Sequence, residues 1–297
     1  MTKREISGYI YAAIASVALA NSFIFSKLSF SEVNFYQFGF FWFFTGTIWN
    51  FLYVLSMRHK NKFSFRASVK KINRELLAVS LLEAVATGLF YYAILIMENP
   101  GVVSFIGNVG PVFVVIFGVV FLKESFNKVQ LFGIILAIGG VFAISLKGFD
   151  SFNELLISGS QYVVLAAFLF SIATIIARKK RKTIDPAVLS LVRALILLFS
   201  FTLIILATQS SFIISGRAWA LLSAGSFLEV FITIVFAYKS LQYIKAFKTS
   251  LIISTKGIFA LLSAWLFLSL TPLYVEIIGG LISIIGVVFV SFESRNK

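Results

Sequence analysis

Long apolar segments without charged side chains recur along the whole sequence. The stretch from Gly101 to Leu122 is typical, because its only polar side chains are Ser104 and Asn108. About 20 helical residues cross the roughly 30 Å hydrocarbon core of a bilayer, so such a segment is long enough to span a membrane. It is too long for a single strand and lacks the alternation of a membrane β-barrel. The sequence therefore predicts an all-α integral membrane protein.

The apolar segments between charged or turn residues number ten. With 59% hydrophobic and only 13% charged residues in 297, the chain has no room for a separate soluble domain. The predicted transmembrane helices are 7–28, 34–57, 75–97, 101–122, 129–147, 160–177, 187–207, 217–243, 248–268 and 274–292.

The basic residues divide sharply between alternate loops, and this division tests the helix count. Lys and Arg collect on the cytoplasmic side of membrane proteins. One set of loops holds 20 of them, at Lys3, Arg4, Arg58, Lys60, Lys62, Arg66, Lys70, Lys71, Arg74, Lys123, Lys128, Arg178, Lys179, Lys180, Arg181, Lys182, Lys245, Lys248, Arg295 and Lys297. The opposite set holds Lys27, Lys147 and Arg217. We therefore expect both termini to be cytoplasmic.

An internal repeat appears when the chain is shifted against itself by 146 residues. Segment 83–142 aligns with 229–288 without gaps and is identical at 15 of 60 positions, where so apolar a composition gives roughly 5 by chance. The identities include the pair Glu83 and Glu229 and two pairs of glycines, Gly133 with Gly279 and Gly140 with Gly286. Each half, 1–147 and 148–297, contains five predicted helices. Because five is odd, the sequence predicts two inverted repeats.

Several local motifs resemble those of the drug/metabolite transporter superfamily, in its ten-helix form built from two EamA domains. They are Asn21 to Lys27, Asp185-Pro186 with Arg193, Pro111 with Glu124, and the glycine pairs Gly133 and Gly140, Gly279 and Gly286. The chain departs from the family pattern at Gly257 and at Ser269-Leu270. The resemblance implies a secondary transporter that works by alternating access. It also implies a cavity lined by helices 1 to 4 and 6 to 9, with helices 5 and 10 peripheral.

Three charged residues lie deep inside predicted helices. At 1.5 Å per residue, Glu83 lies about 13 Å beyond Arg74, Glu229 lies at a similar depth from the opposite face, and Lys256 lies about 12 Å beyond Lys248. Ions at such depth face a cavity or one another. One interpretation is a substrate site, and the other is a buried pair that only fixes helix packing. Because helix 9 follows helix 8 closely, we expect Lys256 to pair with Glu229 and Glu83 to carry a coupled proton.

Other polar residues in the helices have two interpretations each. Arg193 fits either a structural ion pair or a cavity cation, while Lys239 is expected to snorkel to the cytoplasmic surface. Asn108 and Ser254 either bind substrate or bond to a neighbouring carbonyl. Most aromatic residues are expected to face lipid. The predicted substrate site comprises Lys256, Glu229, Glu83, Asn108, Arg193, Tyr92, Tyr238 and Ser254, and Tyr91 is a further aromatic candidate.

Catalytic and cofactor motifs are missing from the sequence. It has no Cys, a single His, no ATP-binding or dinucleotide fingerprint and no metal-ligand cluster. We therefore expect that the protein is not an enzyme and binds no cofactor or metal. The net charge of +14 is attributed to basic residues of the cytoplasmic loops rather than to nucleic-acid binding. The expected cargo is a small charged or zwitterionic metabolite, such as an amino acid or S-adenosylmethionine, with proton coupling or exchange. The alternative is export of hydrophobic compounds. The expected location is the bacterial inner membrane, and the glycines permit either close intramolecular packing or a homodimer.

Overall fold

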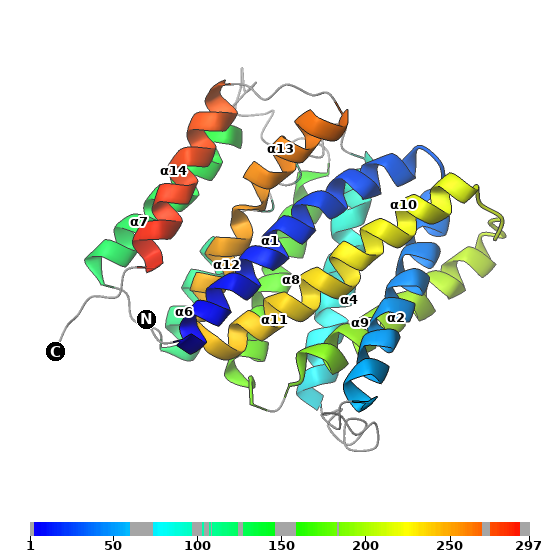
Figure 1. Ribbon diagram of the computed structural model, residues 1–297, viewed down its shortest axis with the longest axis horizontal. Helices are drawn as coiled ribbons and strands as arrows, with labels where there is room; N and C mark the ends of the chain where they lie inside the picture. Colours follow the sequence, from blue (N-terminus) through cyan, green and yellow to red (C-terminus); the bar gives the residue numbers. More distant parts are fainter. Residues whose placement is uncertain are drawn as a thin grey trace.

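A computed structural model describes residues 3–59, 74–96, 103, 107, 109–123, 127–145, 159–182, 184–268 and 274–291, and every regular element in these ranges is helical. The helices of the first half are α1 (Lys3–Phe30), α2 (Phe35–His59), α4 (Arg74–Ile96), α6 (Gly110–Leu122) and α7 (Lys128–Ser145). Those of the second half are α8 (Ser160–Lys179), α9 (Pro186–Ala207), α10 (Gly216–Ser226), η2 (Phe227–Thr233), α11 (Ile234–Tyr243), α12 (Ala246–Ser254), α13 (Lys256–Leu268) and α14 (Tyr274–Ser291). Figure 1 shows them as one bundle.

Seven helices in the described part of the chain are long and apolar enough to cross a membrane. One of them, Gly216–Tyr243, is continuous through α10, η2 and α11, and another, Ala246–Phe267, includes α12 and most of α13. Two shorter apolar helices cover Gly110–Leu122 and Lys128–Gly140. The chain is thus a multi-pass membrane protein, as its apolar segments predict. The count of ten spans stays a prediction.

Interhelical contacts show that the connections gather at two opposite ends of the bundle. At one end, Lys180, which directly follows α8, donates to Glu75 of α4 at 2.8 Å, and Arg178 of α8 donates a hydrogen bond to the carbonyl of Leu241 near the end of α11. At the other end, Gln37 at the start of α2 donates to the carbonyl of Ser211, in the loop after α9, at 2.9 Å. The first end carries the cluster Arg178 to Lys182. The basic cluster therefore lies at the opposite end of the bundle from the start of α2, and the side of the membrane that each end faces stays a prediction.

The assignment of the basic end to the cytoplasm is testable by thiol labelling. Because the chain has no native Cys, single cysteines can be introduced without background. We expect Ser68→Cys and Thr183→Cys to react with an impermeant thiol reagent only from the cytoplasmic side, because Lys and Arg are retained there. Positions 68 and 183 lie outside the described residues. Ser211→Cys should react only from outside, and labelling of position 183 from outside would contradict the predicted topology.

The two halves share helix boundaries as well as sequence. Shifting α6 by 146 residues reproduces both ends of α13, and the same shift takes α7 onto α14. Phe132 near the start of α7 packs against Phe289 near the end of α14, with ring centroids 5.6 Å apart. Likewise Phe43 of α2 stacks on Phe201 near the end of α9, the corresponding helix of the second half, at 5.8 Å. Equivalent helices therefore run antiparallel, which is the relation expected for halves of opposite orientation.

Helix packing separates a central group from an edge pair. In Figure 1, α7 and α14 lie side by side at one edge. In the central group, α1 packs against α10, η2, α11 and α13, while its counterpart α8 packs against α4 and α6. Close approach of α2 to α9 requires a glycine, because a Cβ on Gly39 would lie 2.1 Å from the ring of Phe201. This packing leaves space between the halves for the site described next.

Candidate functional site

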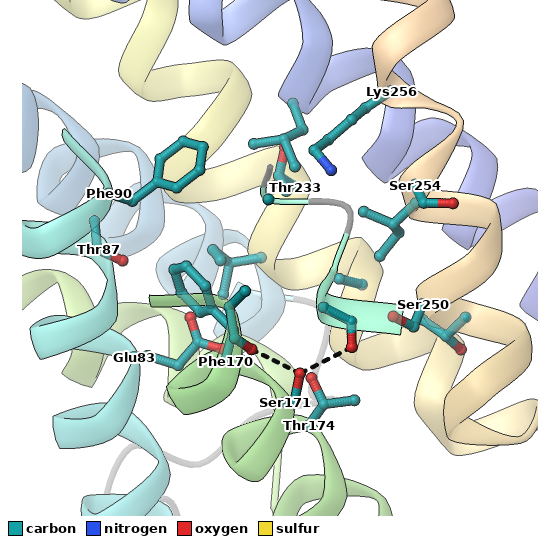
Figure 2. Close-up of a pocket in the computed structure, with 18 of the residues that line it drawn as sticks. Glu83, Thr87, Phe90, Phe170, Ser171, Thr174, Thr233, Ser250, Ser254 and Lys256 are labelled. Carbon is teal, nitrogen blue, oxygen red and sulfur yellow. Dashed lines mark hydrogen bonds between the residues drawn. The ribbon is translucent and has the colours of Figure 1, made fainter. Parts of the chain in front are cut away.

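A cavity of about 200 Å³ lies between the two halves. Its lining comes from α1, α4, α6, α8, α9, η2, α11, α12 and α13, together with Gly107, and none of the lining residues belongs to α7 or α14. Figure 2 shows Lys256 extending toward the cavity from one side, with Glu83 on another. The described lining agrees with the expectation that the last helix of each half is peripheral. It differs for the second helix, because α2 was expected to line the cavity and contributes none of the described lining residues.

Four charged side chains line this cavity. Among its described lining residues only Glu83, Arg193, Glu229 and Lys256 are charged. Each is less than 9% exposed. Two carboxylates and two cations balance electrically when all four are ionised. Because a charged side chain is costly inside a membrane, four of them around one cavity favour a functional site.

Arg193 connects the two glutamates that the repeat relates. Its Nη2 donates to Glu229 Oε1 at 2.8 Å and to the Thr87 hydroxyl at 2.6 Å. Its Nε lies 3.3 Å from Glu83 Oε2. The sequence analysis expected Lys256 as the partner of Glu229, and the structure gives Glu229 the guanidinium of Arg193, which α9 places between α4 and η2.

The two glutamates differ in how fully their oxygens are bonded. Glu229 accepts from Arg193 on Oε1 and from the indole Nε1 of Trp42 on Oε2, at 3.1 Å. Glu83 accepts a hydrogen bond from the Tyr238 hydroxyl on Oε1. Its Oε2 is buried with no hydrogen-bond partner among the described residues. Both oxygens of Glu229 therefore accept hydrogen bonds, whereas Glu83 Oε2 has, within the described part of the chain, only the ion-pair contact with Arg193 Nε.

Lys256, the other cation of the cavity, lies at a break between α12 and α13. α12 ends at Ser254, and α13 begins at Lys256 after a single intervening residue, Thr255. Shifted by 146 residues, this break corresponds to Val109, which precedes α6. Helix N-termini carry partial positive charge, so the start of α13 and the ammonium of Lys256 together favour an anionic group of a ligand.

The structure brings together only some of the predicted site residues. Ser254 lines the cavity and donates to the carbonyl of Leu251, at 2.6 Å, and Tyr238 lines it beside Glu83. Tyr92 does not: it is 37% exposed and packs against Tyr162, with ring centroids 5.1 Å apart. One residue on a helix is a rotation of about 100°, so Tyr91 lines the cavity instead. Asn108 lies outside the described residues.

Two members of the site were missed by the sequence analysis. Trp42 is fully buried in α2, and Thr87 is bonded to Arg193. A signal for Trp42 existed, because Trp is enriched at membrane interfaces and this one lies well inside a predicted span. Thr87 and its repeat partner Thr233 both line the cavity, so the repeat also offered a signal for Thr87. Within the described residues, no group of three or more metal-ligating side chains occurs.

Lys239 lies apart from the cavity, among aromatic rings. Its Nζ donates to the Tyr53 hydroxyl at 2.8 Å. It also lies 5.1 Å from the ring centroid of Phe236 and 5.9 Å from that of Tyr11. These rings belong to α1, α2 and α11, so Lys239 joins the two halves through cation–π contacts. Lys239 is half-buried among these rings, and its snorkelling to the cytoplasmic surface stays a prediction.

Comparison with known proteins identifies the family. The model of the EamA-like transporter family matches twice, over residues 6–146 and 157–292. The chain belongs to the EamA-like transporter family. It is 26% identical over 229 residues to the uncharacterized transporter sll1164 of Synechocystis sp. (strain ATCC 27184 / PCC 6803 / Kazusa). That match covers 73% of this chain and 64% of the relative's length. A crystal structure of a protein with 12% sequence identity has the same fold, with a TM-score of 0.75 over 96% of each chain.

Proposed function

We propose that this EamA-family protein is a secondary carrier for a small charged or zwitterionic organic solute, such as an amino acid or a derivative of one. The balanced set of Glu83, Arg193, Glu229 and Lys256 around one cavity carries the proposal. A zwitterion brings one charge of each sign and preserves this balance. An anion that binds together with a proton does so as well. A neutral hydrophobic cargo would leave four buried charges unused.

Alternating access supplies the mechanism. The antiparallel packing of α2 with α9 and of α7 with α14 supports two inverted halves, and we place ten spans in the full chain. In such carriers the site lies between the halves near the midplane, and a cavity lined by helices of both halves supports such a site here. Movement of one half against the other would expose the charged set to each side of the membrane in turn. We place the protein in the bacterial inner membrane with both termini cytoplasmic.

The volume of the cavity limits the size of the substrate that it can hold in this conformation. About 200 Å³ is below the roughly 300–1,000 Å³ of drug-sized ligand pockets. An amino acid suits this conformation, whereas S-adenosylmethionine requires a more open one. Aromatic residues also line the space, namely Phe23, Phe90, Phe170, Tyr91 and Tyr238. This lining supports the second candidate, export of hydrophobic or aromatic compounds.

A ligand-stabilisation screen separates these candidates. Binding to the folded state raises the apparent melting temperature, so the purified protein can be heated with each member of a metabolite library. We expect amino acids or related zwitterions to stabilise it and neutral aromatic compounds not to. Stabilisation by neutral aromatic compounds alone would reject the charged-solute proposal in favour of efflux.

Lys256 is predicted to be the cation that binds the substrate's anionic group. Lys256→Met keeps the length of the side chain but removes its charge. A hydrogen bond to a charged group contributes about 1.5–3 kcal/mol, so the affinity for a stabilising ligand should fall about 10- to 100-fold. Lys239→Met is the matched control, because Lys239 is not among the cavity-lining residues. Dissociation constants from thermal-shift titrations test this, and equal effects of both substitutions would contradict the assignment.

A further inference from the structure

The helix that carries Glu229 contains a π-helical turn. η2 spans Phe227–Thr233 between α10 and α11. The repeat-related Glu83 lies instead within α4, which is α-helical throughout from Arg74 to Ile96. π-helical turns are rare and often occur at functional sites. The two halves therefore present their equivalent glutamates on different backbones.

Two buried side chains bond to the backbone of this turn. The carbonyl of Val230 accepts from Asn50 Nδ2 at 3.1 Å and from the Ser190 hydroxyl at 2.7 Å. Both donors are fully buried, and they come from α2 and α9. The contact is close, since a Cβ on Gly46 would lie 2.6 Å from Val230 Cγ1. Side-chain hydrogen bonds to carbonyls inside a helix are among the known causes of local departures from α-helical geometry.

The same two helices also bond to the carboxylate of the turn. α9 supplies Ser190 to the backbone and, three residues later on the same face, Arg193 to Glu229. α2 supplies Asn50 to the backbone and Trp42 to Glu229. Each helix thus contacts both Val230 and Glu229. The backbone shape of η2 and the direction of the Glu229 side chain are fixed by one set of contacts.

We infer that Asn50 and Ser190 are positioning residues for the site: they hold the π-helical turn and thereby aim Glu229 at Arg193 and Trp42. If the turn relaxed to an α-helix, its register would change by one residue, which rotates α10 relative to α11 by about 100°. If the α11 residues kept their places in the cavity lining, Glu229 would then point away from Arg193 and lose its hydrogen bond to it. The inference concerns the geometry of the apoprotein and does not depend on the identity of the substrate.

Single cysteines report this register in a chain that has none. Ala237 lines the central cavity, whereas Leu228 lines a separate groove beside α1. With Asn50 and Ser190 intact, Ala237→Cys should react with 2-sulfonatoethyl methanethiosulfonate, and Leu228→Cys should not. In the Asn50→Leu/Ser190→Ala background, we expect the ratio of the two labelling rates to change at least about tenfold, the effect of a 1.4 kcal/mol shift in a conformational equilibrium. An unchanged ratio would overturn the inference.

Matched controls separate register from general loss of packing. Ser200→Ala on α9 and Thr47→Val on α2 each remove a hydroxyl bonded only within its own helix, to Ile196 and Phe43. They should leave the labelling ratio unchanged. If the double variant does not fold, melting temperatures of Ser190→Ala with and without Glu229→Gln decide the question. Ser190→Ala should lower the melting temperature less when Glu229 is already replaced, because the two residues act through one turn. Equal decreases in melting temperature in the two backgrounds would overturn the inference.

Discussion

Replacing Arg193 by leucine is expected to destabilise this protein severely. Arg193 is 1% exposed and is bonded to Glu229 and Thr87, with Glu83 nearby. Removing the guanidinium leaves two carboxylates buried without their cation. Breaking a buried pair in this way costs about 3–5 kcal/mol, which is a large part of the stability of a typical protein. Thermal unfolding in detergent, with the yield of monodisperse protein, measures the loss.

Removing the carboxylates as well should restore much of this loss. In Arg193→Leu/Glu83→Gln/Glu229→Gln no charge remains at these three positions, so the melting temperature should return most of the way to that of the unmodified protein, while ligand binding is lost. Arg217→Leu is the surface control, because the Arg217 side chain is 70% exposed and lies 3.5 Å from Glu32. An exposed pair of this kind contributes about 0–1 kcal/mol. A triple variant as unstable as Arg193→Leu alone would show that Arg193 stabilises the fold by packing rather than by charge.

The helical elements follow from the sequence because the bilayer imposes a length on each span. The predicted ranges 34–57 and 217–243 differ from the observed Phe35–His59 and Gly216–Tyr243 by at most two residues at either end. The repeat could also be predicted, since identical offsets relate α6 to α13 and α7 to α14. The burial of Glu83 and Glu229 could also be expected, since helical rise places both far from the ends of their helices.

The partners of the charged groups could not be predicted in the same way. Proximity along the chain suggested that Lys256 pairs with Glu229, but a buried ion pair depends on how helices rotate and pack. Arg193 reaches both glutamates because α9 packs against α4 and η2. The π-helical turn is a second example. It depends on Asn50 and Ser190, which are distant in sequence from Val230, so no local pattern around Glu229 reveals it.

Glu83 and Glu229 are predicted to differ in function although the repeat relates them. Both oxygens of Glu229 are bonded, to Arg193 and Trp42, whereas Oε2 of Glu83 has no hydrogen-bond partner among the described residues. A proton on Glu83 gives the set of Glu83, Arg193, Glu229 and Lys256 one net positive charge, which an anionic group of the substrate can balance. Glu83 is therefore the candidate proton carrier, since a carboxylate that faces each side in turn can bind and release a proton in each cycle.

Glu83→Gln should accordingly abolish accumulation driven by a pH gradient while exchange of substrate continues. The amide is always neutral, so it mimics the protonated carboxyl and cannot release a proton. Glu229→Gln should instead weaken substrate binding, because it removes the anion that orients Arg193. The measurement is pH-jump uptake and counterflow in proteoliposomes, with the ligand found by the stabilisation screen as substrate. If Glu83→Gln still concentrates that ligand in response to a pH gradient, Glu83 is not the coupling group, and a facilitator or exchanger with structural glutamates becomes the better account.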